Sequence, residues 1–275
     1  MNKVPDITLT SLDTIKAYDL TTGDLKFILD ELQDATIANT QEKQDITGKG
    51  GRKLNSLKKN KAVTISGNNG LISAGLMEIQ TGGEFTENDA VTVDWTDYIT
   101  VKDNKATTGY KATGTAGKEI TAVYKKNSDG TRGDKLEQAA TAEATGKFAY
   151  NPTSKELTFF ENDIADDSEI IVCYKRQLKG YTLSNDSDKY SGKAALYIDG
   201  IGEDACANQY RVQIYVPKAD FSGEFSFQMG GDQSVHAFEA ESLAGSSGCA
   251  GSGLGSSLWT WTVFGVNEAD ATVGG

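Results

Sequence analysis

The sequence predicts a mainly β protein with one short helix. Apolar and polar residues alternate through most of the chain, which is the period of a strand with one buried face. Clusters of turn-forming residues separate these segments, and stretches with helical periodicity are scarce. The 275 residues, of which 38% are apolar, suffice for a substantial core. No repeat of roughly 20–50 residues is visible, which argues against a propeller or a solenoid.

The clearest predicted strand covers residues 210–216, where every second side chain is apolar. Pro217 is expected to end the ladder, because it has no backbone N–H to donate. Residues 224–229 alternate as well. They run into Gly230-Gly231-Asp232, which predicts a hairpin with residues 235–241. Further strands are predicted at 6–20, 61–66, 91–101, 119–125, 156–160, 169–176, 193–199 and 257–264.

The short helix is predicted over residues 71–80, where apolar side chains recur at helical spacing and Gly82-Gly83 follow as a stop signal. Asn68 or Asn69 is expected to cap its first turn. Residues 24–33 also match the helical period, and a strand followed by a loop is the competing interpretation there.

Charge and composition exclude several classes of function. With 27 basic and 39 acidic residues the net charge is −12, so the overall field repels phosphate and argues against a chain-wide nucleic-acid surface. The single histidine, His236, is too few for a His-rich metal site and lies in no recognisable catalytic motif. We expect no enzymatic activity and no cofactor.

Two weaker signals for particular chemistry have plain explanations. The cysteines Cys173, Cys206 and Cys249 are odd in number and form no C-x-x-C motif, which predicts reduced thiols. The carboxylates of residues 161–169 could hold Ca²⁺, but they lack the EF-hand order and favour a solvated turn. Neither a signal peptide nor a membrane-spanning segment is expected from the apolar pattern.

Positive charge is concentrated in residues 43–61, against the trend of the chain. The segment has one acidic residue, Asp45, and seven basic ones: Lys43, Lys49, Arg52, Lys53, Lys58, Lys59 and Lys61. Its balance is 7 − 1 = +6, whereas the rest of the chain carries 20 − 38 = −18. Strand-like residues flank a glycine-rich centre that lacks phosphate-loop spacing, which predicts a long hairpin with a basic tip.

Three interpretations of this basic hairpin remain open. It could contact the acidic surface of another copy of the chain, because self-association of an acidic protein needs charge complementarity. It could be an edge that lysines protect from aggregation. It could also bind nucleic acid through the phosphate backbone.

The C-terminal region combines a predicted loop and a predicted strand. Residues 245–257 are rich in Gly and Ser and predict a flexible loop or arm. The strand that follows has apolar side chains on both faces, with Trp259, Trp261 and Val263 on one of them. It must be covered on both sides, either by completing its own sheet or by adding to a neighbour's sheet.

Two segments of the chain carry a resemblance to a known family. Residues 45–54 (DITGKGGRKL) with 61–67 (KAVTISG) resemble the long hairpin of tailed-phage tail tube (major tail) proteins, which a short helix follows. Residues 216–225 (VPKADFSGEF) with 231–240 (GDQSVHAFEA) are similar to the closing hairpin of the same family. The resemblance implies a β-sandwich or barrel with a flanking helix. It also implies six-membered rings that stack into a tube through which the genome passes.

The resemblance also implies an organisation and a set of partners. Residues 1–95 and 181–275 would form the tail-tube-like β domain, and residues 96–180 an inserted or elaborating β subdomain. The seven basic residues of 43–61 would dock between rings, and Trp259, Trp261 and Val263 would pair between subunits. The partners would be other copies and the tape measure, terminator and baseplate or distal tail proteins, with non-specific passage of double-stranded DNA and no membrane.

The location implied is the tail of the virion, after synthesis in the cytoplasm of a bacterial host. Two alternatives to a tail tube remain. One is another virion component, such as a capsid decoration protein or a tail adaptor. The other is a carbohydrate-binding or adhesin-like β module, which would present exposed aromatic side chains on one concave face.

Overall fold

The computed structural model describes residues 6–226, 235–244 and 256–265, and its chain is mainly β with one α-helix, as the sequence predicts. It divides into two compact units, Met1–Phe85 with Leu183–Gly275 and Thr86–Thr182. The predicted domain boundaries at 95 and 181 remain predictions, because compactness alone does not show that either part folds by itself.

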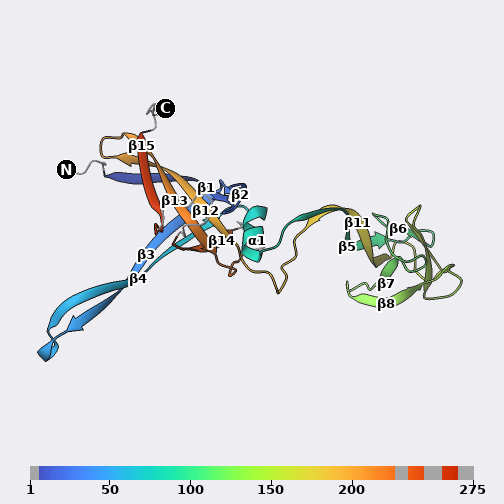
Figure 1. The fold of residues 1–275 in the computed structure, drawn as a ribbon. Helices are drawn as coiled ribbons and strands as arrows, with labels where there is room; N and C mark the ends of the chain where they lie inside the picture. Colours follow the sequence, from blue (N-terminus) through green and yellow to red (C-terminus); the bar gives the residue numbers. More distant parts are fainter. Residues whose placement is uncertain (1–5, 227–234, 245–255, 266–275) are drawn as a thin grey trace. The chain divides into compact units, whose positions relative to one another are not determined.

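The first unit holds one sheet and one helix (Figure 1). Its elements are β1 (Ile7–Tyr18), β2 (Leu25–Leu29), β3 (Leu32–Thr47), β4 (Lys53–Asn69), α1 (Ala74–Thr81), β12 (Lys193–Asp204), β13 (Gln209–Phe221), β14 (His236–Ser242) and β15 (Thr260–Gly265). The strand order is β2-β1-β12-β13-β14-β4-β3, and β15 pairs with the first half of β13. Because β3 returns to contact β1, the sheet curls around a single core.

Strand alternation explains which side chains enter this core. On β4 the odd-numbered positions Val63 and Ile65 are buried, whereas Thr64 and Ser66 point outward. In residues 24–33 the helical interpretation is wrong, because Phe27 and Leu29 enter the core from β2 with a period of two.

Helix α1 packs against β2 and begins three residues later than predicted. Its cap is Ser73, whose hydroxyl accepts a hydrogen bond from the Leu76 amide, so the expected Asn caps are wrong. The two asparagines instead lie at the end of β4, where Asn68 donates to the Asp34 carboxylate. The helix ends at Gly82, whose φ of 70° is the left-handed conformation that glycine adopts at least cost.

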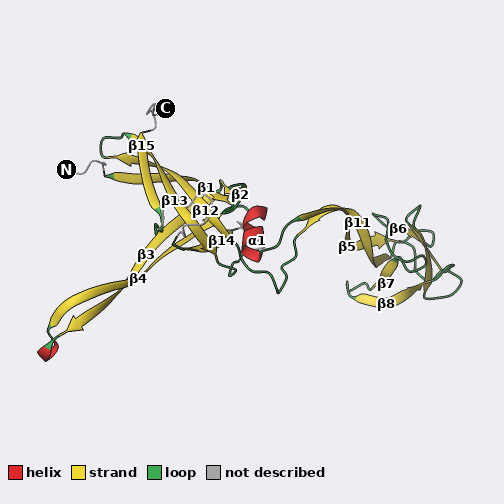
Figure 2. Ribbon diagram, in the orientation of Figure 1, coloured by secondary structure: helices red, strands yellow, loops and turns green. Residues whose placement is uncertain are grey.

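The hairpin of β3 and β4 is the longest paired segment of the first unit, and Figure 2 shows it running beyond the rest of that unit. Only Thr64–Asn69 of β4 also pair with β14, so beyond Val63 the two strands have no third neighbour among the described residues. Between the pairs Thr40–Ala62 and Glu42–Lys59 lies a bulge in which Asn60 has a φ of 51°. We call residues 41–61, which form the part beyond it, the distal ribbon.

The second unit is also all β, around a core of its own. Its strands are β5 (Thr86–Thr100), β6 (Lys105–Thr107), β7 (Ile120–Lys126), β8 (Arg132–Gln138), β9 (Lys147–Asn151), β10 (Glu156–Phe159) and β11 (Glu169–Thr182). Their order is β5-β11-β7-β8-β9-β10-β6, with β8 and β9 parallel. Thr86 pairs with Thr182, so the unit begins and ends at the same place.

Among the described residues, the predicted hairpin of 224–229 with 235–241 is represented by β14, its second strand. Residues 224–226 form no strand, and residues 227–234, with the expected turn, lie outside the described residues. Residues 245–255 of the predicted Gly/Ser-rich arm, with Cys249, lie outside them too.

Candidate assembly surfaces

The structure places all seven predicted basic residues on the distal ribbon or its turn. Lys43 lies on β3, Lys49 and Arg52 lie in and beside the short 3-10 turn Lys49–Gly51, and Lys53, Lys58, Lys59 and Lys61 lie on β4. None of residues 41–61 is buried. An isolated two-stranded ribbon is marginal in water, so burial within its own chain does not account for this ribbon.

The charges of the distal ribbon are only partly neutralised. Lys53 forms a salt bridge of 2.6 Å with Asp45, and the hydrogen bond from Lys53 lowers the pKa of that carboxyl group. Lys59 donates to the Gln44 side chain. Lys43 and Lys58 stand directly opposite each other across the strands, and like charges so placed repel. An acidic partner surface would relieve this repulsion.

Three large apolar side chains are exposed among these bases, and the sequence analysis did not single them out. Ile46 is 41% exposed, Leu54 59% and Leu57 49%. The sequence could have indicated them, since they are the only large apolar residues in the strongly basic segment 43–61. Basic and apolar groups together are typical of a surface that another protein covers.

The outward face of β3, β4 and β14 has the opposite charge. Asp34, Glu239 and Glu241 are exposed there and form no salt bridge with any residue that the structure describes. Hydroxyl and amide side chains of Thr64, Ser66 and Asn68 lie between them.

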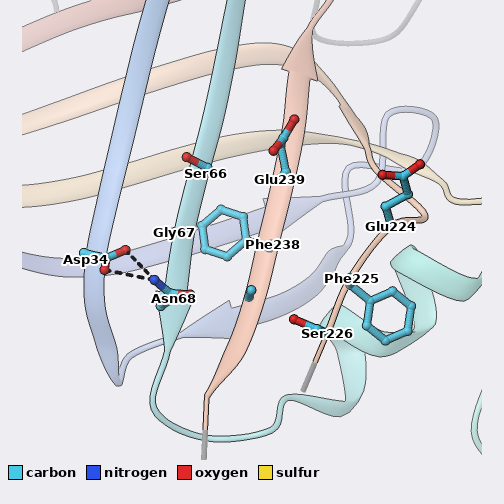
Figure 3. Close-up of a pocket in the computed structure, with 10 residues that line it drawn as sticks. Asp34, Ser66, Gly67, Asn68, Glu224, Phe225, Ser226, Phe238 and Glu239 are labelled. Carbon is cyan, nitrogen blue, oxygen red and sulfur yellow. Dashed lines mark hydrogen bonds between the residues drawn. The ribbon is translucent and has the colours of Figure 1, made fainter. Parts of the chain in front are cut away.

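Figure 3 shows part of this face, a hollow of about 460 Å³ that Glu224 and Glu239 line together with Asp34. Phe238 lies across Gly67 beneath the hollow, where an added Cβ would approach the ring to 2.9 Å. The result is a polar, acidic sheet face on a rigid core.

The comparison with family models is decisive for this chain. The model described as the YomU/Tube protein family matches residues 8–252, which is most of the 275-residue sequence. The chain belongs to the YomU/Tube protein family. The resemblance to phage tail tube proteins is thereby confirmed. A comparison with curated proteins gives no match.

Membership in the YomU/Tube family implies a structural component of the virion that assembles with other tail proteins. Such families are not typically enzymatic. No group of three or more His, Cys, Asp or Glu among the described residues is placed to hold a metal ion. Within the same residues, no helix has the length and apolar character needed to cross a bilayer.

The C-terminal strand of this family member completes its own sheet. β15 pairs antiparallel with β13 from Tyr210–Gly265 to Tyr215–Thr260. Trp259 and Val263 pack against the core, whereas Trp261 stays 45% exposed. The other edge of β15 has no strand beside it among the described residues.

The outward face of β1, β12 and β13 is close to electrically balanced. Lys16 pairs with Asp199 at 2.7 Å, and Arg211 pairs with Asp13 at 3.3 Å. Burial acts to raise the pKa of Asp199, but the hydrogen bonds from Lys16 and Gln213 outweigh it and lower that pKa. This face therefore lacks the acidic excess of the face on β3, β4 and β14.

The exposed aromatic side chains of the second unit bear on the carbohydrate-binding alternative. The rings of Trp95 and Tyr110 stand at 88° to each other, and the Arg176 guanidinium lies over both, at 4.7 Å and 3.5 Å from their centroids. One face of each ring is thus covered by the chain itself. A flat aromatic platform for a sugar is not formed by this pair.

The remaining candidates have structural roles. His236 is fully buried on β14, where Nδ1 accepts from the Ser73 amide and Nε2 lies 2.8 Å from the Gln80 side-chain oxygen. Burial lowers the pKa of His236. In the carboxylate segment 161–169, for which the sequence favours a turn over a Ca²⁺ site, Asp163 accepts hydrogen bonds from Lys125 and from the Gly146 amide, so it stabilises a turn.

Proposed function

We propose that this protein assembles with copies of itself into six-membered rings that stack to form the tail tube, the conduit for double-stranded DNA ejection. The observation that carries the proposal is the distal ribbon, which presents seven bases and three apolar side chains without any core of its own. Contact between copies is favoured over edge protection, because lysines alone would protect an edge and exposed leucines would not. The protein then resides in the virion tail, after synthesis in the host cytoplasm.

The channel wall is assigned to the outward face of β3, β4 and β14. Its carboxylates on Asp34, Glu239 and Glu241 repel the phosphates of passing DNA within the screening length of roughly 8–10 Å. Its hydroxyl and amide groups keep the wall hydrated without offering cations that would hold DNA.

Lateral contact between subunits is assigned to the free edge of β15. The exposed Trp261 supplies apolar area next to an edge that pairs with no other described strand, which is the usual setting of strand addition. In this proposal Trp259 and Val263 act indirectly, because they fix β15 on its own core.

The segment 96–180 is proposed to be an insertion that ring formation does not need. Thr86 and Thr182 are paired neighbours, so a short linker can replace residues 87–181 between them. A chain shortened in this way is expected to keep forming rings, as seen by electron microscopy.

Electron microscopy of the purified full chain, alone and at high concentration, tests the proposal directly. Six-fold rings or tubes with a central channel are the expected result. Particles that remain monomeric at high concentration would overturn it. The tape measure, terminator and baseplate or distal tail proteins are the further partners that tubes of this kind would bind.

A further inference from the structure

The two ends of the β3–β4 hairpin carry different surfaces. At one end lies the distal ribbon. At the other end β3 begins at Leu32 and β4 finishes at Asn69, and these two residues are paired. Sixteen residues of β3 separate the ends, which is about 50 Å at roughly 3.3 Å per strand residue.

This second end has the reverse charge and its own exposed apolar residues. Asp30 and Glu31 precede β3, are exposed, and form no salt bridge with a described residue. Leu71 and Ile72, just after β4, are 58% and 47% exposed. A hydrogen bond of 2.8 Å from the Gly70 amide to the Glu31 carbonyl holds the two segments together. We call these four residues, Asp30, Glu31, Leu71 and Ile72, the acidic end.

We infer that the acidic end of one copy receives the distal ribbon of the next copy. This inference rests on the proposed function and names the surface that the ribbon contacts. The bases of the ribbon then contact the carboxylates of the acidic end. Leu54 and Leu57 contact Leu71 and Ile72, so apolar area that is exposed in the single subunit becomes covered in the assembly.

The geometry of such a contact explains why it propagates. The two surfaces differ from each other and lie at opposite ends of one strand pair, so the contact is head-to-tail. A head-to-tail contact that does not close on itself repeats without limit. Each added copy leaves a new free ribbon at one end and a new free acidic end at the other.

The acidic face of β3, β4 and β14 is the competing receptor, and it fits less well. Its outward residues include the carboxylates Asp34, Glu239 and Glu241 but no exposed large apolar side chain. It would neutralise the lysines of the ribbon and leave Ile46, Leu54 and Leu57 uncovered. The acidic end supplies both kinds of contact.

A charge-swap experiment in the full chain tests the inference. The variant Asp30→Lys/Glu31→Lys is expected to form rings while its sedimenting stacks fall by about tenfold or more, because like charges then face each other. The variant Lys58→Glu/Lys59→Glu is expected to behave in the same way. The fourfold variant restores opposite charges and is expected to stack to within about twofold of the unaltered chain.

A matched control separates this contact from a general effect of net charge. Asp134→Lys/Glu143→Lys makes the same change in charge on exposed residues of the second unit and is expected to stack normally. Rings of Asp30→Lys/Glu31→Lys that still stack, or a fourfold variant that does not recover, would overturn the inference while leaving the tube proposal intact. An unaltered chain that forms neither rings nor tubes would overturn the proposed function itself.

Discussion

The two halves of the β3–β4 hairpin are built from the same two strands, which stay paired on both sides of the bulge at Asn60, yet they have opposite environments. In the proximal half, Val63 and Ile65 are completely buried and β14 covers the edge of β4. In the distal ribbon no residue is buried and neither strand has another neighbour in the described chain. Hydrogen bonding alone therefore does not decide what a strand contributes. We expect the proximal half to determine the stability of the subunit and the distal ribbon to determine its assembly.

Removing the distal ribbon should separate the two roles most completely. Replacing residues 41–61 with Asn-Gly joins Thr40 to Ala62, which already face each other, through a two-residue turn. The thermal midpoint of the isolated subunit is expected to stay within a few degrees, while sedimentation detects no stacks. A subunit that fails to fold after this deletion would show that the distal ribbon is needed for stability as well as for assembly.

Single side chains should show the same difference. Ile65→Ala is expected to cost about 2–5 kcal/mol of unfolding free energy, because it empties a fully buried core position. Leu57→Ala is the matched change on the distal ribbon and is expected to alter that free energy by less than about 0.5 kcal/mol. Urea unfolding measures both. Equal losses for the two variants would mean that the ribbon belongs to the folding core.

Mild acid should destabilise the proximal half through His236. His236 lies opposite Asn69 of β4, and burial lowers its pKa below the usual 6.5, so the folded state favours the neutral ring. As the pH falls below about 6.5, His236 gains a proton in the unfolded chain but stays neutral in the folded chain. The free energy of unfolding therefore decreases there, by at most about 1.4 kcal/mol per pH unit. The carboxylates whose pKa is lowered, such as Asp19 and Asp199, begin to contribute only at lower pH.

Thermal unfolding at pH 7.5 and pH 5.5 checks this expectation. The unaltered chain should lose stability between the two values, whereas His236→Gln should be less stable at both and nearly independent of pH. An equal decrease in the two proteins would assign the pH effect to other groups.

The smallest expected effect comes from the repulsive pair in the distal ribbon. Lys43→Glu places a carboxylate opposite Lys58 and should stabilise the isolated ribbon by roughly 0.2–1 kcal/mol. Amide hydrogen exchange of residues 41–61 in the isolated subunit measures the change. Stacking should weaken at the same time, since one base is lost from the contact surface. Faster exchange in Lys43→Glu would show that the two lysines do not repel each other there.

The sequence was informative where a periodic apolar pattern coincides with a buried face. It predicted the proximal part of β4 at 61–66, residues 193–199 of β12 and residues 210–216 of β13 for this reason. The expected end of the ladder at Pro217 is wrong, because β13 continues past a bulge and pairs with β12 up to Asp220. The long hairpin was predicted from its charge and glycines, but no alternation of apolar side chains marks residues 53–60 of β4, because a ribbon without a core needs none. The Asn caps were wrong because Asn68 and Asn69 are used in β4 pairing, which depends on strands distant in the sequence.

Of the two proposed contact surfaces, the sequence revealed one and not the other. The seven bases of the hairpin were visible as a local excess of charge, and the tail tube family followed from local motifs. The acidic end was not visible, because Glu31 and Leu71 come together only when β3 and β4 pair.

The bulge at Asn60 has a consequence for how this hairpin can change. Two residues of β4 there oppose the single Gln41 of β3, so odd-numbered side chains of β4 point outward before the bulge and inward after it, at Val63 and Ile65. The extra residue therefore changes which face of β4 the odd-numbered side chains occupy. Deleting it would exchange the faces of Leu57 and Lys58 while Val63 and Ile65 stay in place. The deletion of one codon, in evolution or by design, could thus exchange the two faces of the distal ribbon and leave the rest of the subunit unchanged.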